Sequence, residues 1–308
     1  MKKDFLSLYD LEKSDFEEIF QRSESLKQKA RDGILYTPLA GKTLGMIFDK
    51  SSTRTRLSFE VGMFQLGGIA MFLSRRDIQL GRGETIADTA RVMSRYLDGV
   101  MIRTFAQEWV EDFAANATIP VINGLTDLLH PCQIISDLFT IIERKGRYEG
   151  LTVAYVGDGN NIANSWINAA AKLPFALRLA CPEGYDPDEA IFKRGVAEAS
   201  HGVFLFREPA NAVAGADVIY TDVWASMGQE AEQEERNIIF KDYQVNSQLT
   251  AYGGKDALIM HCLPAHRGEE ITDDVLDGPH SVVIDQAENR LHVQKAVMEI
   301  LIGGRKIQ

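Results

Sequence analysis

The sequence has few cysteines, no long hydrophobic run and no excess of basic residues. Its 308 residues contain three cysteines, Cys132, Cys181 and Cys262, without the spacing of a disulfide framework, which indicates a reducing compartment. No run approaches the roughly eighteen apolar residues of a membrane span. The N-terminus offers neither the apolar core of a signal peptide nor an acid-poor transit segment, so we expect a cytoplasmic protein with no membrane partner.

Basic charge is scarce as well. The chain has 33 Lys and Arg residues against 44 Asp and Glu residues, for a net charge of −11. A nucleic acid would need a basic face, so no nucleic-acid partner is expected. Hydrophobic residues make up 45% and charged residues 25%, which is typical of a globular protein. The length allows two domains, and small-molecule chemistry is favoured.

Short apolar runs alternate with amphipathic segments, and the alternation resumes after Lys145-Gly146-Arg147. The predicted strands are 44–48, 69–73, 100–102, 120–122, 152–156, 177–180, 203–206, 218–220, 258–260 and 282–284. The predicted helices include 55–66, 86–96, 109–115, 131–142, a final helix 288–302, and a first helix opened by a capping box at Ser14–Glu17. This alternation predicts the α/β class, with two doubly wound parallel-sheet domains, 1–145 and 146–308, and an active-site cleft between them.

The hexapeptide Ser51–Arg56 directly follows one apolar run and opens a predicted helix. A helix N-terminus has unpaired N–H groups and the positive end of the helix dipole, which favour an anion. The hydroxyl groups and the forked guanidinium of Arg54 suit a phosphate. A solvated N-cap beside two surface arginines is the alternative, and the hexapeptide alone leaves both interpretations open.

Two further features point to the same kind of ligand. His130-Pro131-Cys132-Gln133 opens a helix with proline at its first position, and His130 and Gln133 are spaced to reach one ligand. Arg103 ends a predicted strand at the carboxyl edge, where ligands gather in parallel sheets. An ordinary surface arginine is the alternative for Arg103, and we interpret Cys132 as inert.

The second half of the chain carries candidate ligands for an amino acid. Asp222 follows a predicted strand, where a carboxylate can pair with an ammonium group, and the turn Ser226-Met227-Gly228 can close over an aliphatic chain. Asn160 and Asn161 follow the tight turn Gly157–Gly159 and suit a zwitterion, with a helix N-cap as the alternative. That turn lacks the third glycine and the acidic residue of a dinucleotide fingerprint, so a dehydrogenase is the weaker interpretation.

The run His261-Cys262-Leu263-Pro264 follows another predicted strand and leaves three interpretations of the thiol open. Cys262 could be an inert buried thiol. A metal site with His261 and His266 is conceivable, although the spacing matches no standard zinc pattern. The third interpretation is a thiolate that contacts a ligand, which requires nearby cationic stabilisation.

In this order, and with Glu288-Asn289-Arg290 near the end, these motifs resemble the aspartate/ornithine carbamoyltransferase family over essentially the whole chain. Asp222 would repel a dicarboxylate, so the resemblance is to members that use ornithine. It implies carbamoyl transfer from carbamoyl phosphate to the δ-amine of L-ornithine, giving L-citrulline and phosphate in arginine metabolism. It also implies that 1–145 binds carbamoyl phosphate, that 146–308 binds ornithine, and that helix 286–308 returns to the first domain.

The resemblance implies roles for individual residues as well. Phosphate binding is implied for Ser52, Thr53, Arg54, Thr55 and Gln79, the last reaching in from a neighbouring subunit of a homotrimer. The carbonyl oxygen of the carbamoyl group is expected to be held by Thr55, Arg103 and His130. Its amide nitrogen is expected to be oriented by Gln133, Leu263 and Arg290. Ornithine is bound by Asn161, Asp222, Ser226 and Met227. The catalytic set is Arg54, Arg103, His130 and Cys262, with Cys262 against both substrates. No metal or organic cofactor is expected, because the chemistry needs only positioning and charge stabilisation.

Two alternatives concern the reaction itself. The acceptor could be a related amine such as putrescine or an N-acylated ornithine, because the shape of the loop that follows Asp222 decides this and the sequence does not show it. A protein that only binds an amino acid or a phosphate is the other alternative. A pure binder needs no such set as the one present here, which comprises Arg54, Arg103, His130, Cys262 and Arg290.

Overall fold

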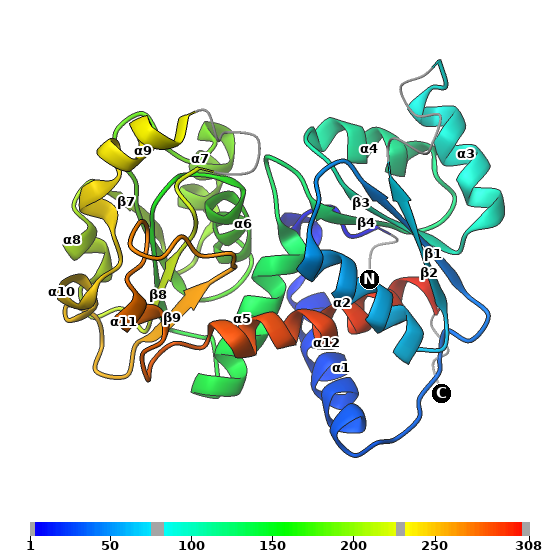
Figure 1. Ribbon diagram of the computed structural model, residues 1–308, viewed down its shortest axis with the longest axis horizontal. Coiled ribbons are helices and arrows are strands. Elements are labelled where there is room, and N and C mark those ends of the chain that lie inside the picture. Colours follow the sequence, from blue (N-terminus) through cyan, green and yellow to red (C-terminus); the bar gives the residue numbers. More distant parts are fainter. Residues whose placement is uncertain (1–3, 75–82, 226–231, 304–308) are drawn as a thin grey trace. The chain divides into compact units, whose positions relative to one another are not determined.

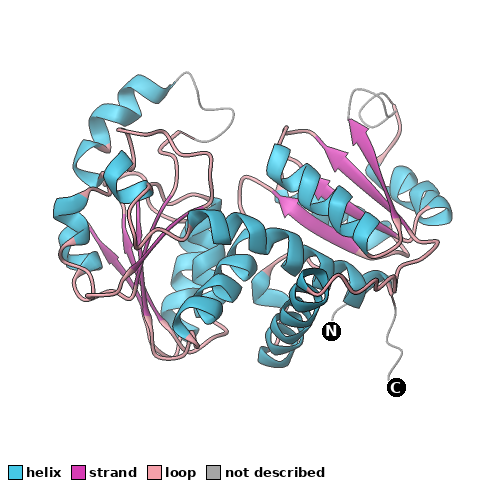
Figure 2. Cartoon of the chain, turned by 60° about the horizontal axis from the view of Figure 1, so that its bottom comes forward, coloured by secondary structure: helices cyan, strands magenta, loops and turns pink. Residues whose placement is uncertain are grey.

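A computed structural model describes residues 4–74, 83–225 and 232–303 of the chain. The chain divides into two compact units: unit 1 comprises Met1–Phe139 and Glu288–Gln308, and unit 2 comprises Thr140–Ala287. The division falls within two helices, α5 (Pro131–Lys145) and α12 (Val283–Ile302). Each unit is built around one sheet whose strands are all parallel (Figures 1 and 2).

The sheet of unit 1 has the strand order β2-β1-β3-β4. Its strands are β1 (Thr43–Phe48), β2 (Ile69–Ser74), β3 (Gly99–Arg103) and β4 (Val121–Leu125). The helix α2 (Thr53–Gln65) lies on one side of it, and α3 (Ile86–Tyr96) and α4 (Gln107–Asn116) lie on the other (Figure 1). The η1 turn (Leu8–Asp10) and α1 (Lys13–Arg31) precede β1. A buried apolar cluster joins the sheet to α3 and α4 through residues such as Ile102, Ala90 and Phe113.

The sheet of unit 2 has the strand order β7-β6-β5-β8-β9. Its strands are β5 (Thr152–Val156), β6 (Ala176–Ala180), β7 (Val203–Phe206), β8 (Val218–Thr221) and β9 (Leu258–His261). Its helices are α6 (Asn161–Ala170), α7 (Glu189–Glu198), α8 (Pro209–Val213), α9 (Gln233–Ile239), η3 (Lys241–Tyr243), α10 (Ser247–Thr250) and α11 (Asp273–Leu276).

Both faces of this second sheet are buried, as expected for parallel strands. Side chains alternate along β5: Ala154 and Val156 belong to a core cluster that includes residues of α8. On β8, Tyr220 stacks on the ring of Tyr155 and meets Trp166 of α6 edge to face, with ring centroids 6.0 and 5.7 Å apart. Accordingly, α6 lies on one side of the sheet and α8 on the other (Figure 1). This arrangement confirms the predicted α/β class with doubly wound parallel sheets.

The strand order reverses once in each sheet. In unit 1 the chain runs outward from β1 to β2 and then crosses to β3, on the other side of β1. In unit 2 it runs outward from β5 through β6 to β7 and then crosses to β8. Ligands of doubly wound sheets bind beyond the carboxyl ends of the strands at such a reversal. The segments after β1 and β3, and those after β5 and β8, are therefore the places to look for a site.

The part of α12 from Glu288 onward belongs to unit 1. Gly62 of α2 allows close packing, because a Cβ atom there would lie 2.8 Å from Cε of Met298. The Lys27 ammonium on α1 donates to Oδ1 of Asn289 at 2.7 Å. These contacts fix the helix segment that carries Arg290.

Two details of the predicted secondary structure are wrong. The run 282–284 is not a strand: Val282 N–H donates to the carbonyl of Ile259, the Gln286 N–H then donates back to the carbonyl of Val282, and α12 begins at Val283. The backbone therefore turns into a helix directly after one β-bridge. The capping box of α1 is formed by Glu12 and Asp15 instead of Ser14 and Glu17, so Ser14 lies inside the helix.

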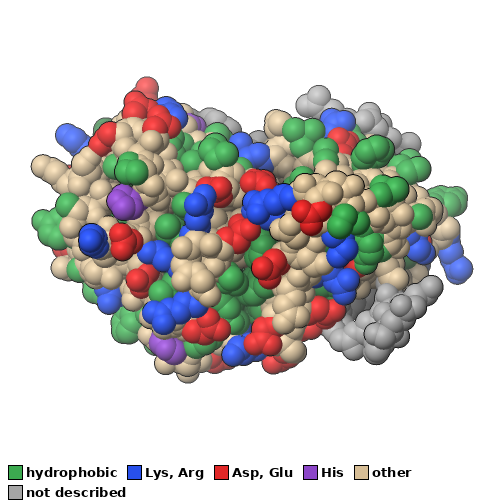
Figure 3. Space-filling view, turned by 90° about the horizontal axis from the view of Figure 1, so that it is seen from below, with side chains coloured by type: hydrophobic (Ala, Val, Ile, Leu, Met, Phe, Trp, Pro, Cys, Tyr) green, Lys and Arg blue, Asp and Glu red, His purple; other side chains and the backbone are tan. Residues whose placement is uncertain are grey.

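Charge is mixed on one face of the surface (Figure 3), and the described helices are not of the membrane-spanning kind. On the face seen in Figure 3, acidic and basic side chains are interspersed, with no large patch of a single sign. Across residues 4–74, 83–225 and 232–303, none of the helices has the length and apolar character needed to cross a bilayer.

Candidate functional site

The segment between β1 and α2 in unit 1 forms the helix N-terminus predicted to hold an anion. Ser52 is the N-cap of α2, and its Oγ accepts the Thr55 N–H at 3.2 Å. Thr53 is exposed, Arg54 is half-buried and Thr55 is fully buried. Because the Asp49 N–H donates to the Arg103 carbonyl at 2.9 Å, this segment is also tied to the end of β3.

Arg290 links three elements of unit 1. Its Nη1 donates to Oε1 of Gln133 on α5 at 2.9 Å, and its Nη2 donates to Oγ1 of Thr55 on α2 at 3.1 Å. All three side chains are buried, so these bonds are shielded from water. A planar guanidinium held in this way has little freedom to rotate, and it fixes the two polar groups beside it.

His130 lies among the arginines of unit 1. Its pKa is well below the usual value of 6.5, first because the ring is buried and then because Arg290, Arg103 and Arg54 repel a second positive charge. The imidazole is therefore neutral at physiological pH and can donate one hydrogen bond without adding charge. Neutral His130 and the three guanidiniums form a cationic group suited to an anion that also carries a carbonyl oxygen.

Asp137 is a functional candidate that the sequence analysis missed. Its Oδ1 accepts a hydrogen bond from Nε2 of Gln133 at 2.8 Å, one turn along α5, and the side chain is fully buried. This bond fixes which way the Gln133 amide points, so that its oxygen faces Arg290. The spacing of four residues on a helix was the signal available in the sequence. On the same helix, burial raises the pKa of the Cys132 thiol to about 12, which fits its interpretation as inert.

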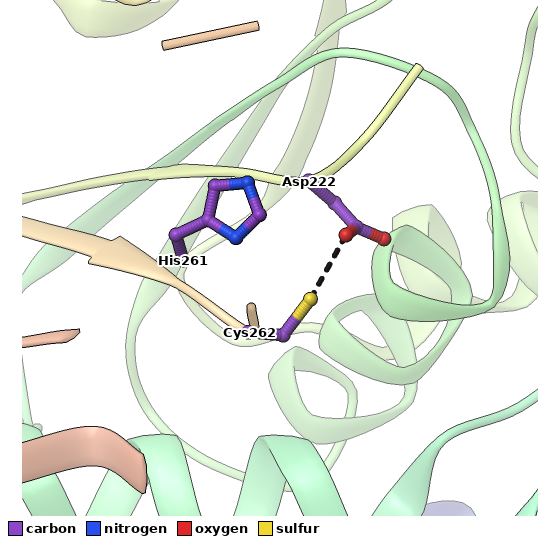
Figure 4. A group of neighbouring side chains, drawn as sticks. All are labelled: Asp222, His261 and Cys262. Carbon is purple, nitrogen blue, oxygen red and sulfur yellow. Dashed lines mark hydrogen bonds between the residues drawn. The ribbon is translucent and has the colours of Figure 1, made fainter. Parts of the chain in front are cut away.

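In unit 2, Asp222 accepts hydrogen bonds from two side chains at the carboxyl edge of the sheet. Its Oδ1 accepts from Sγ of Cys262, which follows β9, at 2.9 Å, and its Oδ2 accepts from Nδ2 of Asn160, which follows β5, at 2.8 Å. In Figure 4 the Asp222 carboxylate and the Cys262 thiol point toward each other. Asp222 is buried while Cys262 is partly exposed, so the thiol can meet a ligand.

Asn160 and Asn161 were predicted as a pair that suits a zwitterion, but they have different positions and partners in the structure. Asn160 is the N-cap of α6, because its Oδ1 accepts the Ile162 N–H at 2.9 Å, and it also binds Asp222. Asn161, the predicted ornithine ligand, is the first residue of α6 and is partly buried. The contact of Asn160 with Asp222 was not predicted, because 62 residues separate the two in the sequence. Gln79, Ser226 and Met227 lie outside the described residues.

His261 supports the backbone beside Cys262 and is not available to a metal. Its Nδ1 accepts the Leu263 N–H at 2.9 Å, so the proton lies on Nε2, which donates to Oε1 of buried Glu270 at 3.0 Å. The first bond holds Leu263 in the left-handed region, with φ at 57°. Asp222, His261 and Cys262 have ligand atoms close enough to hold an ion (Figure 4), but both ring nitrogens of His261 already have partners. The arrangement therefore does not fit the metal-site interpretation.

These two groups of residues define a class of protein. Each lies where the strand order of a doubly wound sheet reverses; one is cationic, and the other pairs a thiol with a carboxylate. Such places in doubly wound α/β proteins are typical binding sites for small molecules, and the cationic group suits an anionic one.

The chain belongs to the aspartate/ornithine carbamoyltransferase family. The model of the family's carbamoyl-P binding domain matches residues 3–143, and that of its Asp/Orn binding domain matches residues 149–301. An ornithine carbamoyltransferase of Syntrophus aciditrophicus is 72% identical over 302 residues, which cover 98% of this chain and all of that protein.

Solved structures of the family share the fold. The ornithine carbamoyltransferase of Pyrococcus furiosus is 54% identical, with a TM-score of 0.95 and 98% of each chain covered. The ornithine transcarbamoylase of Giardia lamblia is only 31% identical, yet its TM-score is 0.87 with 99% of each chain covered. The fold is thus retained although most residues differ.

Proposed function

We propose that this chain transfers the carbamoyl group of carbamoyl phosphate to the δ-amine of L-ornithine, giving L-citrulline and phosphate. The observation that carries the proposal is the cationic group of unit 1: buried Arg290 bonds to Thr55 and Gln133, and burial with the charges of Arg290, Arg103 and Arg54 lowers the pKa of His130 and keeps it neutral. A phosphate next to a polarised carbonyl needs this combination of fixed positive charge and an uncharged donor. The names of the relatives, which are ornithine carbamoyltransferases, agree with it.

We assign carbamoyl phosphate to residues of unit 1, together with Leu263 of unit 2, and ornithine to residues of unit 2. Ser52, Thr53, Arg54 and Thr55 at the start of α2 bind the phosphate in this proposal, and Thr55, Arg103 and His130 polarise the carbonyl oxygen. Gln133, Leu263 and Arg290 orient the carbamoyl nitrogen. The bond from Arg290 to Oε1 of Gln133 supports this role, since Asp137 holds the amide so that its oxygen is the acceptor. A carbamoyl NH₂ is a donor and would meet that oxygen.

Asp222 and Cys262 receive the amine in this proposal. Asn161, Asp222, Ser226 and Met227 hold the amino-acid end of ornithine, and Asp222 and Cys262 lie near the reacting δ-amine. Before attack, the δ-ammonium must lose one proton, and the neutral nitrogen then adds to the carbonyl carbon to give a tetrahedral oxyanion. Collapse breaks the C–O bond to phosphate, which leaves with the electron pair and takes up the second proton of the added nitrogen. Because the free amine is the nucleophile, the rate should rise from pH 6 to pH 9.

The direct test is citrulline formation by purified, chelator-treated protein with carbamoyl phosphate and L-ornithine. Putrescine, N-acetylornithine and L-aspartate are run in parallel as acceptors. Turnover with ornithine alone supports the proposal and excludes an essential metal. Turnover with one of the other amines would leave the assignment of unit 1 intact and move the error to unit 2. No turnover with any acceptor would favour a protein that only binds these ligands.

We propose further that the protein is a cytoplasmic homotrimer in which Gln79 reaches a neighbouring subunit. The edge strand β2 supports an interface, because Ile69, Met71 and Phe72 expose 65%, 47% and 39% of their surfaces. An unpaired edge strand with exposed apolar side chains is normally covered by a partner. Light scattering should give three times the 34.3 kDa of the chain. Mixing inactive Gln79→Ala and Arg290→Gln variants should restore some activity only if Gln79 acts across subunits.

A further inference from the structure

Arg236, on α9, makes a set of buried contacts that the proposed reaction does not explain. Only 6% of its surface is exposed. Its Nη1 donates to Oδ2 of Asp158 at 2.9 Å and to the carbonyl oxygen of Trp224 at 2.8 Å. Its Nε donates to Oε2 of Glu232 at 3.0 Å, and its guanidinium carbon lies 5.0 Å from the centre of the Tyr185 ring. A buried arginine with this many partners holds a fixed position.

The partners of Arg236 lie next to the residues that surround the amine site. Asp158 is two residues before Asn160, in the segment that follows β5. Trp224 is two residues after Asp222, in the segment that follows β8. Arg236 therefore joins the two strand-end segments, and the bond from Asn160 to Asp222 at 2.8 Å joins the same two segments a second time.

We infer that Arg236 is a positioning residue that holds Asp222 in place for the ammonium group of ornithine, by cross-linking the segments after β5 and β8 through Asp158 and the Trp224 carbonyl. Arg236 touches neither substrate in this account and acts through Asp222. Without the cross-link, the Asp222 carboxylate can move relative to Asn160 and to the Cys262 thiol. The inference rests on the proposed function for its kinetic consequences but not for its structural ones.

The kinetic test compares Arg236→Gln, Arg236→Lys and wild-type protein. In Arg236→Gln we expect the KM for ornithine to rise about 10- to 100-fold, because a charge-assisted network is lost, while the KM for carbamoyl phosphate stays within about twofold. Arg236→Lys keeps one donor for Asp158 but loses the forked guanidinium. Its KM for ornithine should therefore lie between those of wild type and Arg236→Gln. If Arg236→Gln does not fold, Arg236→Lys alone carries the kinetic comparison.

Arg207→Gln is the matched control. Arg207 also belongs to unit 2 and also forms an ion pair, with Asp186 at 2.6 Å, but that pair is half-exposed and touches neither Asp222 nor Asn160. The same chemical change should therefore leave both KM values unchanged. A rise in the ornithine KM in this control as large as in Arg236→Gln would show a general loss of structure and would overturn the inference.

A second readout does not depend on catalysis. Alkylation by iodoacetamide at fixed pH reports on Cys262, because Cys132 and Cys181 are buried. Asp222 accepts the S–H hydrogen bond and thereby favours the neutral thiol. Displacing Asp222 should make Cys262 react about three- to tenfold faster in Arg236→Gln, whereas Arg207→Gln should react like wild type.

The two readouts separate the two claims. If wild-type protein forms no citrulline, the proposed function fails, but the alkylation rates still test whether Arg236 positions Asp222. Unchanged alkylation in folded Arg236→Gln would overturn the inference. A changed alkylation rate with an unchanged KM for ornithine would also overturn it, because Asp222 would then move without affecting the acceptor.

Discussion

The two groups of site residues differ in charge and in how they are held. In unit 1, the side chains are mainly cationic, and one guanidinium, that of Arg290, bonds directly to the buried groups of Thr55 and Gln133. In unit 2 the central group is a carboxylate, Asp222, which accepts from Cys262 and Asn160. Arg236, a buried arginine of unit 2, bonds to the Asp158 side chain and to the Trp224 carbonyl, in the segments next to Asn160 and Asp222.

This difference fits the difference between the two proposed substrates. Carbamoyl phosphate is an anion that must be polarised, so positive charge belongs in direct contact with it. Ornithine brings its own positive charge, so an arginine in contact would repel it, and the cation serves only as a support. In the proposed account, arginine therefore binds the substrate in one unit and positions a carboxylate in the other.

The largest expected effect is that of Arg290→Gln. The substitution removes charge from the carbamoyl phosphate site and breaks the bonds to Thr55 and Gln133, each of which joins a charged and a neutral buried group. We expect kcat/KM for carbamoyl phosphate to fall about 1000-fold, from steady-state citrulline assays. A loss below about tenfold would contradict the assignment of direct binding to Arg290.

Asp222→Asn should have the next largest effect and should affect the other substrate. Asparagine keeps the size and one acceptor oxygen but cannot pair with an ammonium group. We expect kcat/KM for ornithine to fall about 100-fold, with the binding of carbamoyl phosphate unchanged. If the affinity for both substrates dropped equally, the division of roles between the units would be wrong.

His292 should make unit 1 sensitive to acid without affecting unit 2. Burial, and then the charges of Lys295, Lys27 and Arg31, lower its pKa from 6.5 to about 3. The unfolded chain therefore binds a proton below pH 6.5 that the folded chain does not, so stability falls as the pH falls from 6.5 toward 3. Between pH 7 and pH 5 this costs about 2 kcal/mol.

Urea unfolding at the two pH values measures this cost. Residue 292 does not titrate in His292→Gln. Between pH 7 and pH 5, the free energy of unfolding of this variant should therefore fall by about 2 kcal/mol less than that of wild type. An equal loss in both proteins would show that His292 does not account for the acid sensitivity. The lowered pKa of His130 also makes the folded state less stable in acid. This contribution is the same in wild type and His292→Gln, so it cancels in the comparison.

The smallest expected effect is a pH dependence of the Arg236 cross-link. Burial raises the pKa of Asp158 from 3.8 to about 6, although the facing Arg236 lowers it; the other facing charges, Asp222 and Glu232, raise it. Below pH 6 Asp158 therefore becomes neutral and its ion pair with Arg236 weakens. The KM for ornithine should then rise about threefold between pH 7 and pH 5, beyond the change caused by protonation of the amine.

Asp158→Asn isolates this effect, because its residue 158 does not titrate. At pH 7 the KM of the variant for ornithine should be higher than that of wild type. Between pH 7 and pH 5 this KM should change only as much as protonation of the amine requires. If the KM for ornithine showed the same additional threefold rise in wild type and in Asp158→Asn, the acid effect would belong to a group other than Asp158.

The sequence predicts the fold well because its signals are local. The helix 86–96 was predicted with the bounds that α3 has, since its cap and its apolar period both lie within the segment. The strand predicted at 282–284 failed because three apolar residues fit a strand and a helix start equally well, and a single bridge to Ile259 decides where the helix begins.

The site is predicted in part, for a related physical reason. Arg103 ends β3 and Asp222 directly follows β8, so their place at the sheet edge follows from the local pattern. Their partners do not: Gln133 and Arg290 are 157 residues apart, and Asp158 and Arg236 are 78 apart. Such pairs depend on packing between distant segments. The carbamoyl phosphate and ornithine roles came from family resemblance.

The most direct test of the division of roles is calorimetric titration of a stable phosphonate analogue of carbamoyl phosphate, without ornithine, into wild type, Arg290→Gln and Asp222→Asn. We predict that Asp222→Asn binds the analogue like wild type, whereas Arg290→Gln binds it at least about 100-fold more weakly. Weak binding by Asp222→Asn, or normal binding by Arg290→Gln, would contradict the account in which the anion is bound by unit 1 and the amine by unit 2.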